Sequence, residues 1–129
     1  MRITVFFTLV LFIVSNCKSF RYPGFSHITE DFYCSLIEIG DKNLKPEPGD
    51  FLTVNLCYKT MKDSIFFHGT RKFRLHPQVK KASLDHCFSM LSEGDSTIFL
   101  LPAKILFEEN LHRSLPSFFD STDMMKMEI

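Results

Sequence analysis

Apolar and polar side chains alternate along several stretches of this 129-residue chain, which indicates a β-rich fold. In residues 51–58, Leu52, Val54, Leu56 and Tyr58 would lie on one face of a strand, with polar residues or a cysteine between them. Runs of branched and aromatic residues predict further extended segments. These are residues 33–39, 64–68, 72–76, 97–101 and 124–129.

One stretch changes to helical spacing. Four apolar residues recur three or four positions apart and would form a single stripe: Leu84, Cys87, Phe88 and Leu91. Ser83 is a suitable N-cap and Gly94 a suitable C-terminal cap. The predicted fold class is therefore α+β, a twisted antiparallel sheet wrapped around one short α-helix.

The first 19 residues predict a secretory signal peptide. Arg2 is followed by an apolar run over residues 3–14 and by small and polar residues over 15–19. This run of twelve residues, which includes two threonines, is too short to cross a bilayer, which needs about 20. We expect an exported protein of the cell envelope that faces the periplasm.

Two ways of processing this signal are open. Residues 14–17 resemble a bacterial lipobox, which would make Cys17 the site of lipidation and the new N-terminus. The alternative is simple cleavage near Ser19. Residues 20–32 contain Pro23 and Gly24 without clear periodicity, so they predict a linker, and residues 33–129 predict one domain.

Composition excludes several classes of partner and cofactor. Fifteen basic residues balance fifteen acidic ones, so no net field favours nucleic acid, and membrane contact is expected only through the lipid anchor. The five histidines are scattered without metal-ligand spacing, and we expect no metal or cofactor. Beyond Cys17 there are three cysteines, Cys34, Cys57 and Cys87, which we interpret as buried free thiols. Twelve of the fifteen phenylalanines follow the signal, which indicates an aromatic core or pocket.

The order of short motifs resembles an FKBP-type peptidyl-prolyl isomerase domain, of the kind found in exported bacterial lipoproteins. The resemblance covers about residues 33–129 and rests on motifs in a fixed order. They are Lys-Pro-Glu-Pro-Gly-Asp at 45–50, a strand ending in Tyr58, Asp-Ser-x-x-Phe at 63–67, Lys-Phe-Arg-Leu at 72–75, Met-Leu-Ser-Glu-Gly-Asp at 90–95 and Phe-Leu-Leu-Pro-Ala at 99–103.

The resemblance implies a dry aromatic pocket that accepts proline and catalyses cis-trans isomerisation of X-Pro bonds in exported polypeptides. It assigns the catalytic positions to Tyr58, Phe67, Phe73, Leu84 and Phe107. It assigns further substrate contacts to His68, Val79 and Met125. Such a pocket needs no nucleophile, metal or cofactor, because it acts by removing water from the amide.

The chain departs from the family pattern at several of these positions. His68 stands where the family has Asp, Leu84 where it has Trp, and Phe107-Glu108 where it has Tyr-Gly. Val79-Lys80-Lys81 lies near a usual Val-Ile pair, and Pro116-Ser117 replaces Pro-Pro. A catalytically degenerate FKBP-like binding or chaperone module is therefore the alternative function. The chain is also compatible with being half of a two-domain lipoprotein.

Overall fold

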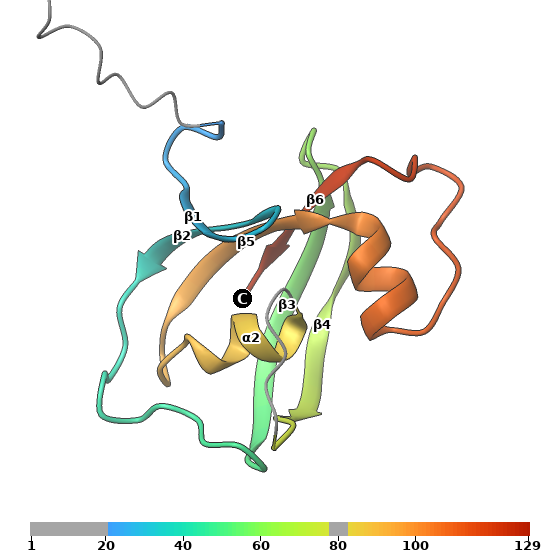
Figure 1. Cartoon of the computed structure of the whole chain (residues 1–129). Coiled ribbons are helices and arrows are strands. Elements are labelled where there is room, and N and C mark those ends of the chain that lie inside the picture. The colour runs from blue at the N-terminus through green and yellow to red at the C-terminus, as the bar shows by residue number, and fades with distance from the viewer. Residues whose placement is uncertain (1–20, 78–82) are drawn as a thin grey trace, which may run out of the picture.

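The computed structural model describes residues 21–77 and 83–129, and within these residues six strands form a single antiparallel sheet. The sheet order is β1-β2-β5-β6-β3-β4, and every neighbouring pair is antiparallel (Figure 1). The strands are β1 Ser26–Thr29, β2 Phe32–Glu38, β3 Phe51–Thr60, β4 Ile65–Arg74, β5 Ser96–Pro102 and β6 Met124–Glu128.

Helix α2, Leu84–Ser89, lies across one face of this sheet (Figure 1). Ser83 caps its N-terminus by accepting a hydrogen bond from the His86 N–H at 3.3 Å. Leu84, Cys87 and Phe88 are buried and join the core formed with inward-facing residues of the sheet. A second helical segment of π type, η2, covers Ile105–Asn110 and buries Leu106.

The α+β class and the antiparallel sheet agree with the sequence, but several element boundaries differ. Residues 64–68 and 72–76 were predicted as two short strands and are one strand, β4, because each residue from Ile65 to Arg74 except Phe66 has a partner on β3. The predicted linker contains strand β1, and Phe32 is already buried in the core. The helix is shorter than expected: its C-cap is Met90, and η2 adds a helical segment that the prediction lacked.

Gly94 does not cap α2 but belongs to a close crossing of two connections. Its φ of +85° suits the turn before β5, and its Cβ position lies 3.3 Å from the Gly40 Cα. A Cβ at Gly40 would overlap the Glu93 carbonyl oxygen, so glycine is needed there. Asp95 joins the two connections by accepting hydrogen bonds from the N–H groups of Gly40 at 2.6 Å and Ser92 at 2.8 Å.

Candidate functional site

A β-bulge places three aromatic rings together near the β3–β4 turn. Tyr58 pairs with Phe67 and Lys59 pairs with Ile65, so Phe66 is an extra residue on β4. A bulge reorients the side chains around it, and here both phenylalanines contact Tyr58. The Tyr58 ring centroid lies 5.1 Å from that of Phe67 and 6.0 Å from that of Phe66.

Phe66 links this strand pair to two other segments. Its ring lies 6.0 Å from Phe107 on η2 and 5.4 Å from both Phe118 and Phe119 in the connection to β6. Tyr58 and Phe119 are buried, whereas Phe118 is 56% exposed. We call these six side chains the aromatic cluster: Tyr58, Phe66, Phe67, Phe107, Phe118 and Phe119. The cluster offers an apolar surface that is dry on one side and open to solvent at its rim.

Phe67 forms part of that rim. Its ring leans over Gly69, where a Cβ would lie 3.3 Å from the tip of the ring. The Arg71 guanidinium lies over the same ring, 4.7 Å from its centroid. Burial raises the pKa of the Tyr58 hydroxyl, and the nearby Arg71 charge opposes this by lowering that pKa. Tyr58 is therefore a neutral phenol at physiological pH.

A separate cavity of about 670 Å³ lies beside the N-terminus of α2. Its apolar wall is formed by Phe73, Leu84 and Phe88, and the rings of Phe73 and Phe88 lie 4.9 Å apart. Asn110 is part of the wall and connects η2 to α2. Its Oδ1 accepts a hydrogen bond from the Leu84 N–H at 3.1 Å, and its Nδ2 donates one to the Ile105 carbonyl at 2.8 Å.

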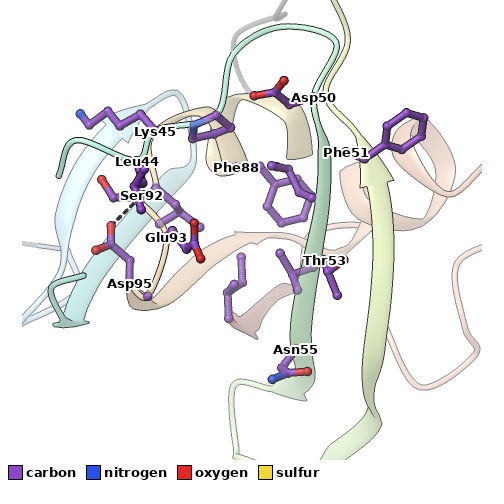
Figure 2. Close-up of a pocket in the computed structure, with 16 residues that line it drawn as sticks. Leu44, Lys45, Asp50, Phe51, Thr53, Asn55, Phe88, Ser92, Glu93 and Asp95 are labelled. Atoms are coloured by element: carbon purple, nitrogen blue, oxygen red, sulfur yellow. Dashed lines mark hydrogen bonds between the residues drawn. The ribbon is translucent and has the colours of Figure 1, made fainter. Parts of the chain in front are cut away.

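A groove of similar volume follows the free edge of β3 (Figure 2). It arises because β6 pairs with β3 from Cys57 to Thr60, so residues 51–56 have a partner strand on one side alone within the part of the chain that the structure describes. Leu52, Val54 and Phe88 supply apolar lining, and Lys45, Asp50, Glu93 and Asp95 lie among the polar residues around it.

The predicted site residues fall into two groups rather than one pocket. Tyr58 and Phe67 are in direct contact, and Phe107 joins them through Phe66. Phe73 and Leu84 instead line the cavity beside α2. Phe67 and Phe73 are six residues apart on one strand, a separation of about 20 Å along it. All five belong to or pack against one hydrophobic core, and their assignment to a single catalytic pocket stays a prediction.

Two further residues that were predicted to contact substrate are not exposed at the surface of the aromatic cluster. His68 pairs with Cys57 and is exposed on the opposite face of β4 from Phe67, because successive side chains of a strand alternate. Met125 is fully buried, so it supports the core instead of presenting a surface to a ligand. Val79 and Cys17 lie outside the described residues.

Sequence reasoning missed Phe66, Phe118, Phe119 and Arg71. The adjacent phenylalanines at 66–67 and 118–119 were a usable signal, since a bulge or turn lets neighbouring aromatic residues contribute to one cluster. Arg71 was interpreted as part of a solvated basic group. Its position two residues after Gly69 on the inner face becomes apparent only from the β3–β4 register.

The described part of the chain contains no group of three or more side chains suited to binding a metal ion. Within residues 21–77 and 83–129, no helix has the length and apolar character needed to cross a membrane. At the aromatic cluster, the side chains present are apolar rings, the Tyr58 phenol and the nearby Arg71 guanidinium.

The fold is similar to that of FKBP-type isomerase structures. A structure of the three FKBP domains of wheat FKBP73 matches with a TM-score of 0.58 at 10% identity, over 76% of this chain and 42% of that chain. A peptidyl-prolyl cis-trans isomerase from Pseudomonas syringae pv. tomato matches with a TM-score of 0.61 at 14% identity, over 84% and 78% of the two chains. FkpA from Escherichia coli also matches with a TM-score of 0.61, at 12% identity, over 84% of this chain and 50% of that one.

These likenesses show an FKBP-like fold. The chain spans less than two thirds of the wheat and Escherichia coli structures that it matches. No protein-family model and no curated protein matches the sequence.

Proposed function

We propose that this chain is a peptidyl-prolyl cis-trans isomerase that acts on X-Pro bonds of exported proteins. The observation that carries the proposal is the contact between Tyr58 and Phe67 on the inner face of an FKBP-like sheet, 5.1 Å between ring centroids. Phe66 contacts Tyr58, and Phe107 and Phe119 contact Phe66, so these rings extend the apolar surface around the pair. Proline is an apolar ring of a size that such a surface can accept.

The proposed mechanism is a change of solvent around the amide. Rotation about a peptide bond faces a barrier of about 18–20 kcal/mol, because it breaks the resonance of the planar amide. Water stabilises the charge-separated planar form more than the twisted one. Transfer of the X-Pro bond to the apolar surface removes that preference and lowers the barrier, and each tenfold acceleration requires about 1.4 kcal/mol of differential stabilisation.

A binding or chaperone-like module without turnover is the second candidate function. It is favoured by the separation of Phe73 and Leu84 from the Tyr58–Phe67 pair. It is also favoured by the charge of Arg71, which lies between the two groups on the same face of β4. A surface that holds proline without enclosing it would bind peptides but leave the amide partly hydrated.

A protease-coupled assay on a proline peptide separates these functions. We expect the chain to accelerate isomerisation in proportion to its concentration, and Phe67→Ala to reduce the rate about tenfold, as loss of about 1.4 kcal/mol of transition-state contact requires. Phe51→Ala is the matched control, because Phe51 is 69% exposed on the opposite face of the sheet. No acceleration at micromolar protein would reject the isomerase and leave the binding module.

The export and lipidation of the chain belong to the same proposal. The apolar run at residues 3–14 supports an exported protein, and Cys17 supports a lipid anchor at the envelope surface. Mass spectrometry of the mature protein tests both points. A diacylated N-terminal Cys17 supports the anchor, an N-terminus near Ser19 supports simple cleavage, and an intact Met1 contradicts export.

A further inference from the structure

Arg71 is a charged residue on the face of β4 that also carries Phe67 and Phe73. It pairs with Val54, so it projects from the same face of β4 as Phe67, Gly69 and Phe73. Its guanidinium packs over the Phe67 ring at 4.7 Å, and it is close enough to Tyr58 to oppose the rise that burial causes in the pKa of the phenol. Since Gly69 has no side chain, nothing from β4 itself separates Arg71 from Phe67.

Arg71 also has no carboxylate partner among the described residues, which include every aspartate and glutamate of the sequence. By contrast, Lys59 binds Glu128 at 2.6 Å and Lys126 binds Asp63 at 2.8 Å. When one face of a guanidinium packs on an aromatic ring, the N–H groups at its edge stay free. Arg71 is exposed, so these donors are accessible from solvent.

We propose that Arg71 makes the aromatic cluster selective for peptides that carry a carboxylate side chain next to the proline. This inference rests on the proposed function, since it names the substrate class of the same site. A proline on the Tyr58–Phe67 surface places its neighbouring residue about one Cα–Cα step, 3.8 Å, along the chain. A Glu or Asp side chain at that residue can reach the free edge of the Arg71 guanidinium.

The general charge of the protein does not supply this selectivity. The sequence carries equal numbers of basic and acidic residues, so long-range attraction of anions is weak. A fixed guanidinium beside an apolar surface acts differently, because its planar donors match the two oxygens of a carboxylate. A substrate that carries Asp or Glu would therefore bind more tightly through this one local contact with Arg71.

The test compares peptides of the form Ala-Xaa-Pro-Phe with Glu, Gln or Lys at Xaa. Binding of fluorescently labelled peptides is measured by anisotropy, and isomerisation of unlabelled ones by NMR exchange. We expect the Glu peptide to bind about fivefold more tightly than the Gln peptide and the Lys peptide to bind least, as one exposed ion pair provides. Salt at 0.5 M should remove most of this difference, since it screens exposed charges.

Arg71→Gln should bind the Glu and Gln peptides equally. The matched control is Lys72→Gln, which removes the same charge from the neighbouring position on the opposite face of β4, paired with Thr53. The Lys72→Gln variant should keep the fivefold preference for the Glu peptide over the Gln peptide. Equal binding of Glu and Gln peptides by the unaltered protein overturns the inference, as does a loss of preference in Lys72→Gln that matches the loss in Arg71→Gln.

The failure of this inference is distinguishable from failure of the proposed function. Isomerisation of every peptide without a Glu preference rejects only the role of Arg71. A Glu preference in binding without acceleration of any peptide rejects the isomerase and retains the acidic-peptide site. The salt dependence of the unaltered protein keeps the inference testable even where Arg71→Gln does not fold.

Discussion

Cys87 illustrates how strongly the core affects a single side chain. It projects from α2 into the core and is only 1% exposed. Burial raises the pKa of its thiol to about 12, and the nearby Cys34 adds to the increase. Because the thiolate is the reactive form of cysteine, Cys87 is chemically inert while the protein is folded.

We therefore predict that iodoacetamide at pH 8 leaves Cys87 unmodified in the native protein and modifies it rapidly in urea. The half-buried Cys57 serves as the internal comparison, since it has partial access to solvent. Mass spectrometry of tryptic peptides gives the extent of labelling at each cysteine. Equal labelling of Cys87 in buffer and in urea would mean that the thiol is not enclosed.

At the scale of elements, Asp95 holds the start of β5 against the connection that follows β2. Hydrogen bonds from the Gly40 and Ser92 N–H groups lower the pKa of its carboxyl group, and the bond from Gly40 is the largest cause. A lowered folded-state pKa means that the charged form stabilises the fold. This contribution is complete above the ordinary carboxyl pKa of about 3.9 and is lost as the pH falls through the lower folded pKa.

Asp95→Ala should reduce the free energy of unfolding by about 1–2 kcal/mol at pH 7, because two backbone N–H groups lose their acceptor. The difference from the unaltered protein should shrink below about pH 4. Urea denaturation at pH 7 and pH 3 measures both values. Asp31→Ala is the control, because its contact with Arg21 is long, at 3.7 Å, and exposed. An equal loss at both pH values would contradict the assigned role of the charge.

The elements also show which features of the fold could be predicted from the sequence. Strand β3 and the buried face of α2 were predictable, because alternation and helical spacing are local patterns. The continuity of residues 64–68 and 72–76 as one strand, β4, was not predictable. Gly69 lies between them, and its place in the strand depends on its pairing with Leu56 and on the Phe67 ring that covers it. The division of the predicted site into two groups was equally hidden. It depends on the position of η2 and on the bulge at Phe66, which are set by tertiary packing.

At the scale of the whole molecule, the aromatic cluster connects three segments that are distant in sequence. Phe66 comes from β4, Phe107 from η2, and Phe118 and Phe119 from the connection before β6. Phe66 contacts Tyr58 as well, so the proposed site and the stability of this end of the fold depend on one connected set of contacts. The apolar wall of the cavity beside α2 depends on a different ring contact, between Phe73 and Phe88, although η2 also reaches this cavity through Asn110.

Phe66→Ala should therefore lower the free energy of unfolding by about 2–3 kcal/mol, somewhat less than a fully buried phenylalanine, because Phe66 is half-buried. Phe51→Ala, at an exposed ring, should change it by about 0.5 kcal/mol or less. Urea denaturation gives both values, and amide chemical shifts show where the structure responds. We expect the Phe66→Ala shifts to concentrate in residues 105–108 and 118–119, and to leave Phe73, Leu84 and Phe88 in the wall of the cavity beside α2 unchanged. Equal responses at both places would mean that the aromatic cluster and that cavity behave as one site, as the single-pocket prediction required.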